Sequence, residues 1–192
     1  MNTTLRLLLY TPLVLGFLYG CVSIAPAPYP EAWEKPATSI SNIEKRIVGD
    51  YNCKGKTLRP SSHEVIDAGY LPQSLHMNVK GSCDTVRFSQ VTVSELEITF
   101  IGDGITLETK TFLAGEDYNT ADGWLVFKWS EGGKVREGYA IAGGHAGGSD
   151  SLTLDMSGNL LVKSSFTAAA LIVVIPIIGY GSTWAKYERQ SN

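Results

Sequence analysis

The sequence predicts an all-β protein, a single antiparallel domain built as a sandwich or a partly open barrel of about eight or more strands. Two observations predict this class. From residue 43 onward, apolar and polar residues alternate with the period of two that is typical of half-buried strands. Glycine-rich turns separate most of these segments, and the only helical signal is one short turn that Ser41 to Glu44 would cap.

The first element is a signal peptide over residues 1–20. One cation, Arg6, precedes an apolar stretch from Leu7 to Leu18, and the small residue Gly20 stands just before Cys21. A charge, an apolar core and a small residue in this order are typical of an export signal. The apolar stretch is shorter than the about 20 residues that a membrane-spanning helix needs, so we expect the segment to be removed.

The end of this segment, Leu18-Tyr19-Gly20-Cys21, resembles a bacterial lipobox, although Tyr19 is bulkier than the usual residue. Together with the strand start at residues 47–51, it makes the chain similar to small lipoproteins of Gram-negative bacteria. The resemblance implies type II processing, in which a peptidase cuts before Cys21 after its sulfur has received diacylglycerol. Cleavage without lipid, as in an ordinary secretory signal, is the alternative.

The same resemblance implies a location. In that family an aspartate directly after the lipidated cysteine commonly signals retention in the inner membrane, and this chain has Val22 there. The resemblance therefore implies an outer-membrane lipoprotein that faces the periplasm. It implies no particular activity.

Residues 21–40 form a lipid-anchored, proline-rich tether. Four prolines lie between Pro26 and Pro36, and alternating Ala-Pro favours an extended polyproline conformation. A free tether of this length would hold the domain up to about 60 Å from the anchor. Recognition of the tether by a partner groove is the alternative to a simple spacer.

The β-rich periplasmic domain occupies residues 41–192. Its hairpin signal is clearest at Gly102-Asp103-Gly104, which separates two alternating segments. Further turns are expected at residues 131–133, 143–144 and 157–159. The strand candidates are residues 75–80, 95–100, 105–111, 124–129, 135–142, 151–156, 160–166, 171–178 and 183–188.

The three cysteines suggest a disulfide. If Cys21 carries lipid, Cys53 and Cys83 remain as an even pair in an oxidising compartment. A bond between them would close a 30-residue loop, which should stabilise the fold by about 3 to 4 kcal/mol. Two buried free thiols are the alternative. Neither cysteine has a near cysteine neighbour, which excludes a Cys-x-x-Cys metal or redox site.

One apolar run interrupts the alternation near the C-terminus. With its central proline it is too short to span a bilayer as a helix. We favour a strand buried on both faces, with the proline at a bulge or edge. An exposed contact loop that touches lipid, an apolar ligand or a partner is the alternative. The run consists of Leu171, Ile172, Val173, Val174, Ile175, Pro176, Ile177 and Ile178.

Charge and motifs argue against several classes of function. After processing, 15 Lys and Arg face 19 Asp and Glu without a basic patch, so we expect no nucleic-acid partner. Residues 50–57 end like a phosphate-binding loop, but the first glycine is one position too early and Pro60 follows, so we expect no nucleotide.

Metal and catalytic motifs are also missing. The three histidines are far apart in sequence, and Asp117, Asn119 and Asp122 miss the spacing of a calcium loop. No cofactor, metal or catalytic residue is predicted, and we do not expect an enzyme.

Two functions remain in contention, with an enzyme third. One is a binding or accessory structural module of the envelope, which holds the membrane through its N-terminal lipid and would have an envelope protein as partner. The other is a carrier or sensor of a lipidic or other apolar small molecule. We favour the first, because inward-facing residues such as Leu96, Phe100, Phe127 and Trp129 are large enough to fill the interior.

Overall fold

The computed structural model describes residues 27–37, 41–58, 64–75, 77–135, 142–172 and 175–191. Two short helices, α2 (Ile43–Arg46) and α3 (Leu71–Ser74), accompany the strands. The strands are β1 (Gly49–Asn52), β2 (Lys54–Leu58), β3 (Val65–Tyr70), β4 (Thr85–Thr92), β5 (Glu95–Gly102), β6 (Ile105–Leu113), β7 (Tyr118–Ala121), β8 (Trp124–Val135), β9 (Ala142–Leu154), β10 (Leu160–Ile172) and β11 (Ile175–Tyr187).

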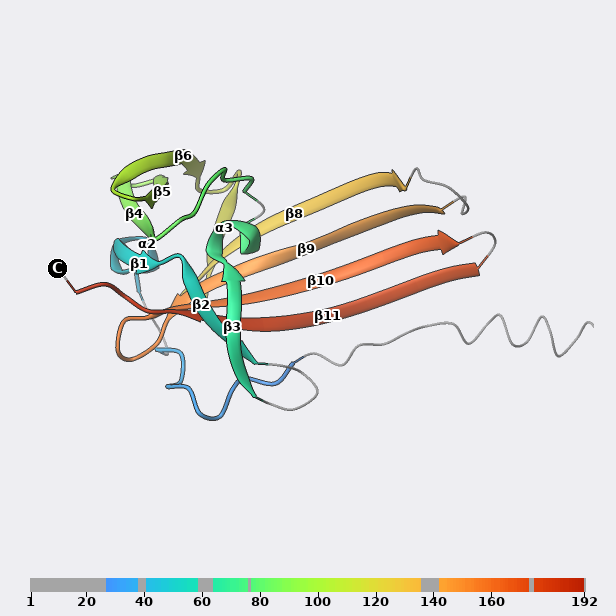
Figure 1. The fold of residues 1–192 in the computed structure, drawn as a ribbon, viewed down its shortest axis with the longest axis horizontal. Coiled ribbons are helices and arrows are strands. Elements are labelled where there is room, and N and C mark those ends of the chain that lie inside the picture. Colours follow the sequence, from blue (N-terminus) through green and yellow to red (C-terminus); the bar gives the residue numbers. More distant parts are fainter. Residues whose placement is uncertain are drawn as a thin grey trace, which may run out of the picture. The chain divides into compact units, whose positions relative to one another are not determined.

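The described residues form an all-β fold, as the sequence predicts. One antiparallel sheet has four strands in the order β1-β4-β5-β6, and the other has seven in the order β3-β2-β11-β10-β9-β8-β7. Figure 1 shows β8, β9, β10 and β11 as long strands lying side by side. Two antiparallel sheets of this kind are consistent with the sandwich that the sequence predicts.

The core lies between the two sheets. On β5 the alternation places Leu96, Ile98 and Phe100 inward, and all three are completely buried. The rings of Phe112 on β6 and Phe127 on β8 meet edge to face with their centroids 5.2 Å apart, which joins the first sheet to the second. Burying a side chain of this size stabilises the fold by about 1.5 to 3 kcal/mol, so these contacts hold the sheets together.

The chain divides into two compact units. The larger comprises Ala27–Trp129, Gly148–Ser165 and Ser182–Asn192, and contains the whole first sheet. The smaller includes Ser130–Gly147 and Phe166–Gly181. Strands β8 to β11 therefore contribute residues to both units.

Several predicted turns and strands are confirmed. The β5–β6 hairpin turns at Asp103 and Gly104, which both have positive φ (49° and 72°). Gly158, in the predicted turn between β9 and β10, has φ 83°. The short helical turn predicted near residue 43 is α2, but its N-cap is Asn42 and no side chain caps it, so the capping expected from Ser41 to Glu44 is wrong.

The predicted strand at residues 75–80 is wrong. Leu75 and Met77 are buried, as their alternation suggests, but the backbone there makes no strand. Their N–H groups instead donate to the carbonyls of Leu71 and Pro72 in α3 (3.1 and 2.8 Å). Because these N–H groups already donate hydrogen bonds within a turn, they cannot pair with a neighbouring strand.

Two predicted glycine turns, at residues 131–133 and 143–144, are also wrong, because both lie within strands β8 and β9. Glycine in these strands permits close packing as well as turning. At Gly148 of β9, a Cβ atom would lie 2.7 Å from the Trp129 ring, so only glycine fits there without a shift of its neighbours.

The apolar run is divided between two strands. Leu171 and Ile172 end β10, and the backbone from Ile175 to Ile178 begins β11, so the expected single strand over 171–178 is wrong. Val173, Val174 and the side chains of the whole run lie outside the described residues. The choice between a buried strand and a contact loop therefore stays a prediction.

Candidate functional site

The N-terminal segment Ala27–Ala37 is docked on the second sheet, where the sequence predicts a free spacer. At one end the N–H of Ala27 donates to the Ser182 carbonyl (3.3 Å) and the indole N–H of Trp184 donates to the Ala27 carbonyl (3.1 Å). At the other end the Ala37 N–H donates to the Leu154 carbonyl (2.9 Å). The segment therefore contacts both β9 and β11.

Aromatic side chains fasten this segment. Tyr29 meets Trp184 edge to face with ring centroids 4.9 Å apart, and Trp33 is buried in the same small cluster as Leu161 of β10. The Tyr29 hydroxyl donates to the Glu34 carbonyl. Burial, together with the negative charges of Asp155 and Glu34, raises the pKa of Tyr29 to about 12, so this hydroxyl stays protonated and remains a donor at neutral pH.

A groove of about 340 Å³ lies beside the docked segment on the outer face of the second sheet. On β8, Trp124 and Val126 line it, whereas the alternate residues Leu125 and Phe127 point into the core. The period of two in this strand therefore separates residues that stabilise the fold from residues that are available at the surface.

The neighbouring strands supply the rest of the groove. Ser151 comes from β9, Lys163 from β10 and Trp184 from β11. Ala121, at the end of β7, and Asp122, in the β7–β8 turn, complete the lining. The rings of Trp124 and Trp184 lie 6.0 Å apart, and Lys163 Nζ lies 5.5 Å from the centroid of the Trp184 ring. That distance allows a cation–π contact, which keeps the ammonium group at the groove.

The polar side chains of the groove have capacity to spare. Within the described residues, the carboxylate of Asp122 and the hydroxyl of Ser151 have no hydrogen-bond or ion-pair partner, and the Lys163 ammonium contacts only the Trp184 ring. A few well-placed polar groups among aromatic and aliphatic walls are typical of ligand sites. This groove is the candidate functional site.

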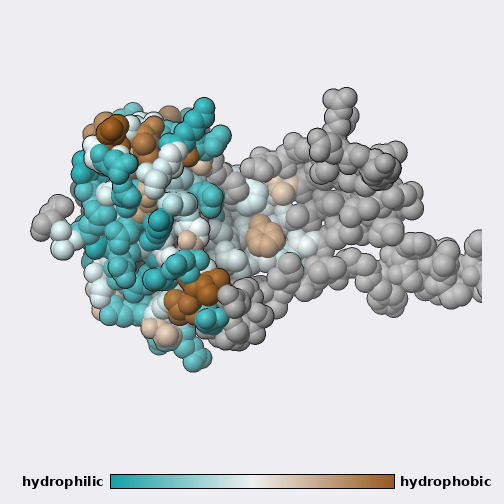
Figure 2. Space-filling model, in the orientation of Figure 1, coloured by the Kyte–Doolittle hydropathy of each residue, from teal (hydrophilic) through white to brown (hydrophobic). Residues whose placement is uncertain are grey.

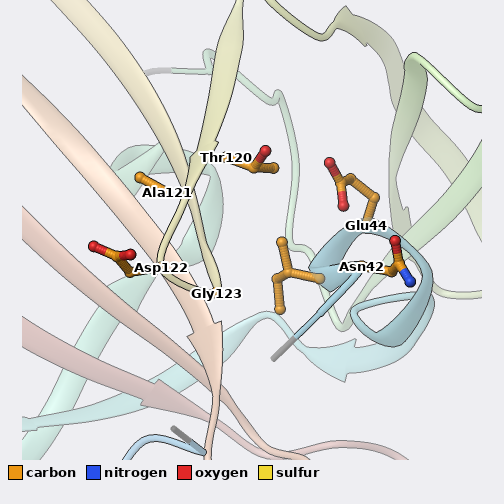
Figure 3. Close-up of a pocket in the computed structure, with 7 residues that line it drawn as sticks. Asn42, Glu44, Thr120, Ala121, Asp122 and Gly123 are labelled. Atoms are coloured by element: carbon orange, nitrogen blue, oxygen red, sulfur yellow. The ribbon is translucent and has the colours of Figure 1, made fainter. Parts of the chain in front are cut away.

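A second hollow, of about 250 Å³, lies between the start of α2 and the β7–β8 turn. Its lining includes Asn42, Glu44 and Thr120 and contains no aromatic ring. Figure 3 shows Glu44 and Asn42 on one side of this hollow, with the side chain of Asp122 directed away from them. Its lining is mainly polar and offers no ring, which makes it the weaker candidate.

Exposed apolar side chains occur elsewhere without forming a site. Figure 2 shows mostly hydrophilic residues on one face of the larger unit, with separate hydrophobic patches. Val91, Val93 and Leu113, which lie at one end of the first sheet, are 55%, 87% and 38% exposed. Single exposed apolar side chains are common on protein surfaces, so these residues do not by themselves indicate a site.

The structure describes some of the predicted site residues and not others. Cys53 and Cys83 lie at disulfide distance, with Cα atoms 5.7 Å apart, as the cysteine count suggests. Cys21 lies outside the described residues. The sequence did not predict the groove. The available signal was a tryptophan in each of two predicted strands, Trp124 in residues 124–129 and Trp184 in residues 183–188.

The described residues hold no group of three or more His, Cys, Asp or Glu side chains that could bind a metal ion. Neither of the two described helices, each only four residues long, has the length to cross a bilayer. Comparison with protein-family models, with curated proteins and with solved structures finds no match for this chain.

Proposed function

We propose that this protein is an outer-membrane lipoprotein, anchored at Cys21, whose β domain works as a binding module of the envelope. The binding surface is the groove on the outer face of the second sheet. One observation carries the proposal: aromatic rings and polar side chains without hydrogen-bond or ion-pair partners, from β8 to β11 and the β7–β8 turn, meet at one open hollow.

The docked N-terminal segment supports a membrane-proximal position for this groove. Six residues lead from Cys21 to Ala27, and covalent geometry lets them span at most about 22 Å. Ala27 is itself held by Trp184, a wall of the groove. A lipid on Cys21 would therefore keep the groove close to the membrane surface, where envelope components are concentrated.

The interior of the fold favours a surface-binding role over the carrier of an apolar small molecule. The core cluster of the larger unit includes Tyr51, Phe88, Phe100 and Leu152, all fully buried. A carrier for a lipidic molecule needs an apolar cavity, whereas in the described part of the larger unit these side chains pack together in the core.

Two measurements test the proposal. Metabolic labelling with a palmitate analogue should mark the wild type and miss Cys21→Ala, because lipid attachment requires that thiol. A photo-crosslinking amino acid at Val126 should form adducts with an envelope component in intact cells, whereas the same probe at Lys110, exposed on β6, should not. Equal labelling of both proteins would contradict the anchor, and the absence of adducts at Val126 would contradict the binding surface.

A further inference from the structure

We propose that the groove binds a neutral saccharide chain. This inference rests on the proposed function and names the ligand class for the same surface. It follows from three properties of the groove: a partly exposed indole, polar groups without hydrogen-bond or ion-pair partners, and a floor formed by strands inside the sheet.

The walls suit a ring that has an apolar face. Trp124 presents a partly buried indole and Val126 adds methyl groups beside it on the same strand, whereas Trp184, only 9% exposed, supports the Trp124 ring at 6.0 Å. A pyranose ring carries C–H groups on one face, which pack against an indole, whereas its hydroxyl groups project around the rim. Trp124 is only partly buried, so its ring keeps surface available for such a contact.

The polar groups suit hydroxyls. Asp122 offers acceptors, Lys163 offers donors, and the Ser151 hydroxyl offers both. Sugar hydroxyls also donate and accept, so a saccharide can use all three groups. A purely apolar ligand would cover these groups without bonding them, which costs free energy.

Charge and backbone exclude the main competitors. The lining holds one ammonium and one carboxylate, so the groove has no excess positive charge to attract a phosphorylated or sulfated ligand. Strands β8 to β11 are consecutive neighbours inside the sheet, so their backbone groups are already engaged in pairing. A peptide that added as a further strand would pair with β7, the edge strand whose Ala121 also lines the groove, and not with β8 to β11, which carry the rings, Ser151 and Lys163.

Calorimetric titration of the purified protein tests the inference. The probes are three neutral tetrasaccharides (an N-acetylglucosamine oligomer, a cellulose oligomer and a maltose oligomer), a sulfated tetrasaccharide and the peptide Ala-Pro-Ala-Pro-Tyr-Pro. We expect at least one neutral probe to bind with a Kd below about 1 mM. The sulfated probe and the peptide should bind at least about tenfold more weakly.

Variants locate the binding. Trp124→Ala should weaken it at least about tenfold, and Trp124→Phe should retain much of it, because the phenyl ring keeps a flat face. Ser151→Leu should block the groove while leaving the core untouched, as thermal melting would verify. Lys128→Ala, at an exposed residue of β8 that does not line the groove, is the matched control and should bind like the wild type.

The inference is overturned if no neutral tetrasaccharide binds at a concentration of about 10 mM, tenfold above the expected upper limit of the Kd. It is also overturned if Trp124→Ala and Ser151→Leu both bind like the wild type. Tighter binding of the peptide or the sulfated probe would also overturn it. Crosslinks at Val126 in cells without saccharide binding would leave the binding surface standing and reject only the ligand class.

Discussion

At the scale of single residues, Asp155 organises the turn between β9 and β10. Its side chain is completely buried and accepts hydrogen bonds from the N–H groups of Ser157 and Asn159 (3.0 and 2.8 Å). Lys186 Nζ lies 2.8 Å from the other carboxylate oxygen. Burial alone would raise the pKa of Asp155, but the hydrogen bonds from Lys186 and Asn159 hold it below its ordinary value.

We therefore expect Asp155→Asn to lower the free energy of unfolding by about 2 kcal/mol at pH 7, since a charged acceptor in a buried network is lost. The lowered pKa means that this contribution is present above the unfolded value of 3.8 and is lost as pH falls through the lower folded value. Urea denaturation should show the difference from the wild type shrinking below pH 4.

A matched control for this prediction is Asp67→Asn. Asp67 also has a lysine partner, Lys56 at 3.0 Å, but its side chain is 87% exposed. Exposed ion pairs contribute little, so the urea midpoint should change little. An Asp155→Asn protein that unfolds at the wild-type midpoint at pH 7 would contradict the structural role of the buried carboxylate.

At the scale of elements, the sequence predicts those strands whose two faces differ in polarity. Strand β5 is one example, because Leu96, Ile98 and Phe100 alternate with polar residues and face the core as expected. Strand β4 was missed, although Val86 and Phe88 are buried in the same way. The alternation of apolar and polar residues in β4 covers few positions, and polar residues flank it on both sides.

The long strands were underestimated for a different reason. Strands β8 and β9 contain glycine pairs, which indicate turns when only local conformation is considered. In the folded chain a glycine such as Gly148 accommodates the ring of Trp129, which belongs to a neighbouring strand. Local sequence cannot distinguish a glycine that bends the chain from one that makes room for a distant side chain.

The cysteine pair joins two connecting segments of the larger unit. Cys53 lies between β1 and β2, and Cys83 lies just before β4; both side chains are buried. We expect the double variant Cys53→Ala/Cys83→Ala to unfold with a free energy about 3 to 4 kcal/mol lower, because the 30-residue loop is no longer closed in the unfolded chain. Urea denaturation of both proteins measures this difference.

Peptide mapping without reductant provides the independent check. Protein purified from an oxidising compartment should yield one linked peptide that contains Cys53 and Cys83. Wild-type protein with two titratable thiols at these positions would refute the bond.

At the scale of the whole molecule, the groove shows what a single sequence does not contain. Trp124, Ser151, Lys163 and Trp184 span 60 positions and meet only because β8 to β11 are consecutive neighbours in one sheet. Alternation predicts which face of a strand is apolar, but it carries no information about which strands are adjacent. The docking of the N-terminal segment could not be predicted for the same reason, because the carbonyl groups and the indole ring that it contacts lie on β9 and β11.

The role of the apolar run at residues 171–178 also depends on which parts of the folded chain surround it. Ile175 begins β11, which has β10 as a neighbour in the sheet, whereas β2 pairs with β11 at Ala185 and Lys186, near its other end. We expect Ile175→Asp to destabilise the protein by about 3 kcal/mol or more, because a strand buried on both faces would enclose an unpaired charge. Val65→Asp on β3 is the control. Val65 is 46% exposed, so thermal melting of that variant should stay close to that of the wild type. If Ile175→Asp melts like its parent and instead loses association with membranes, the run is a contact loop, and the binding surface of this protein extends beyond the groove.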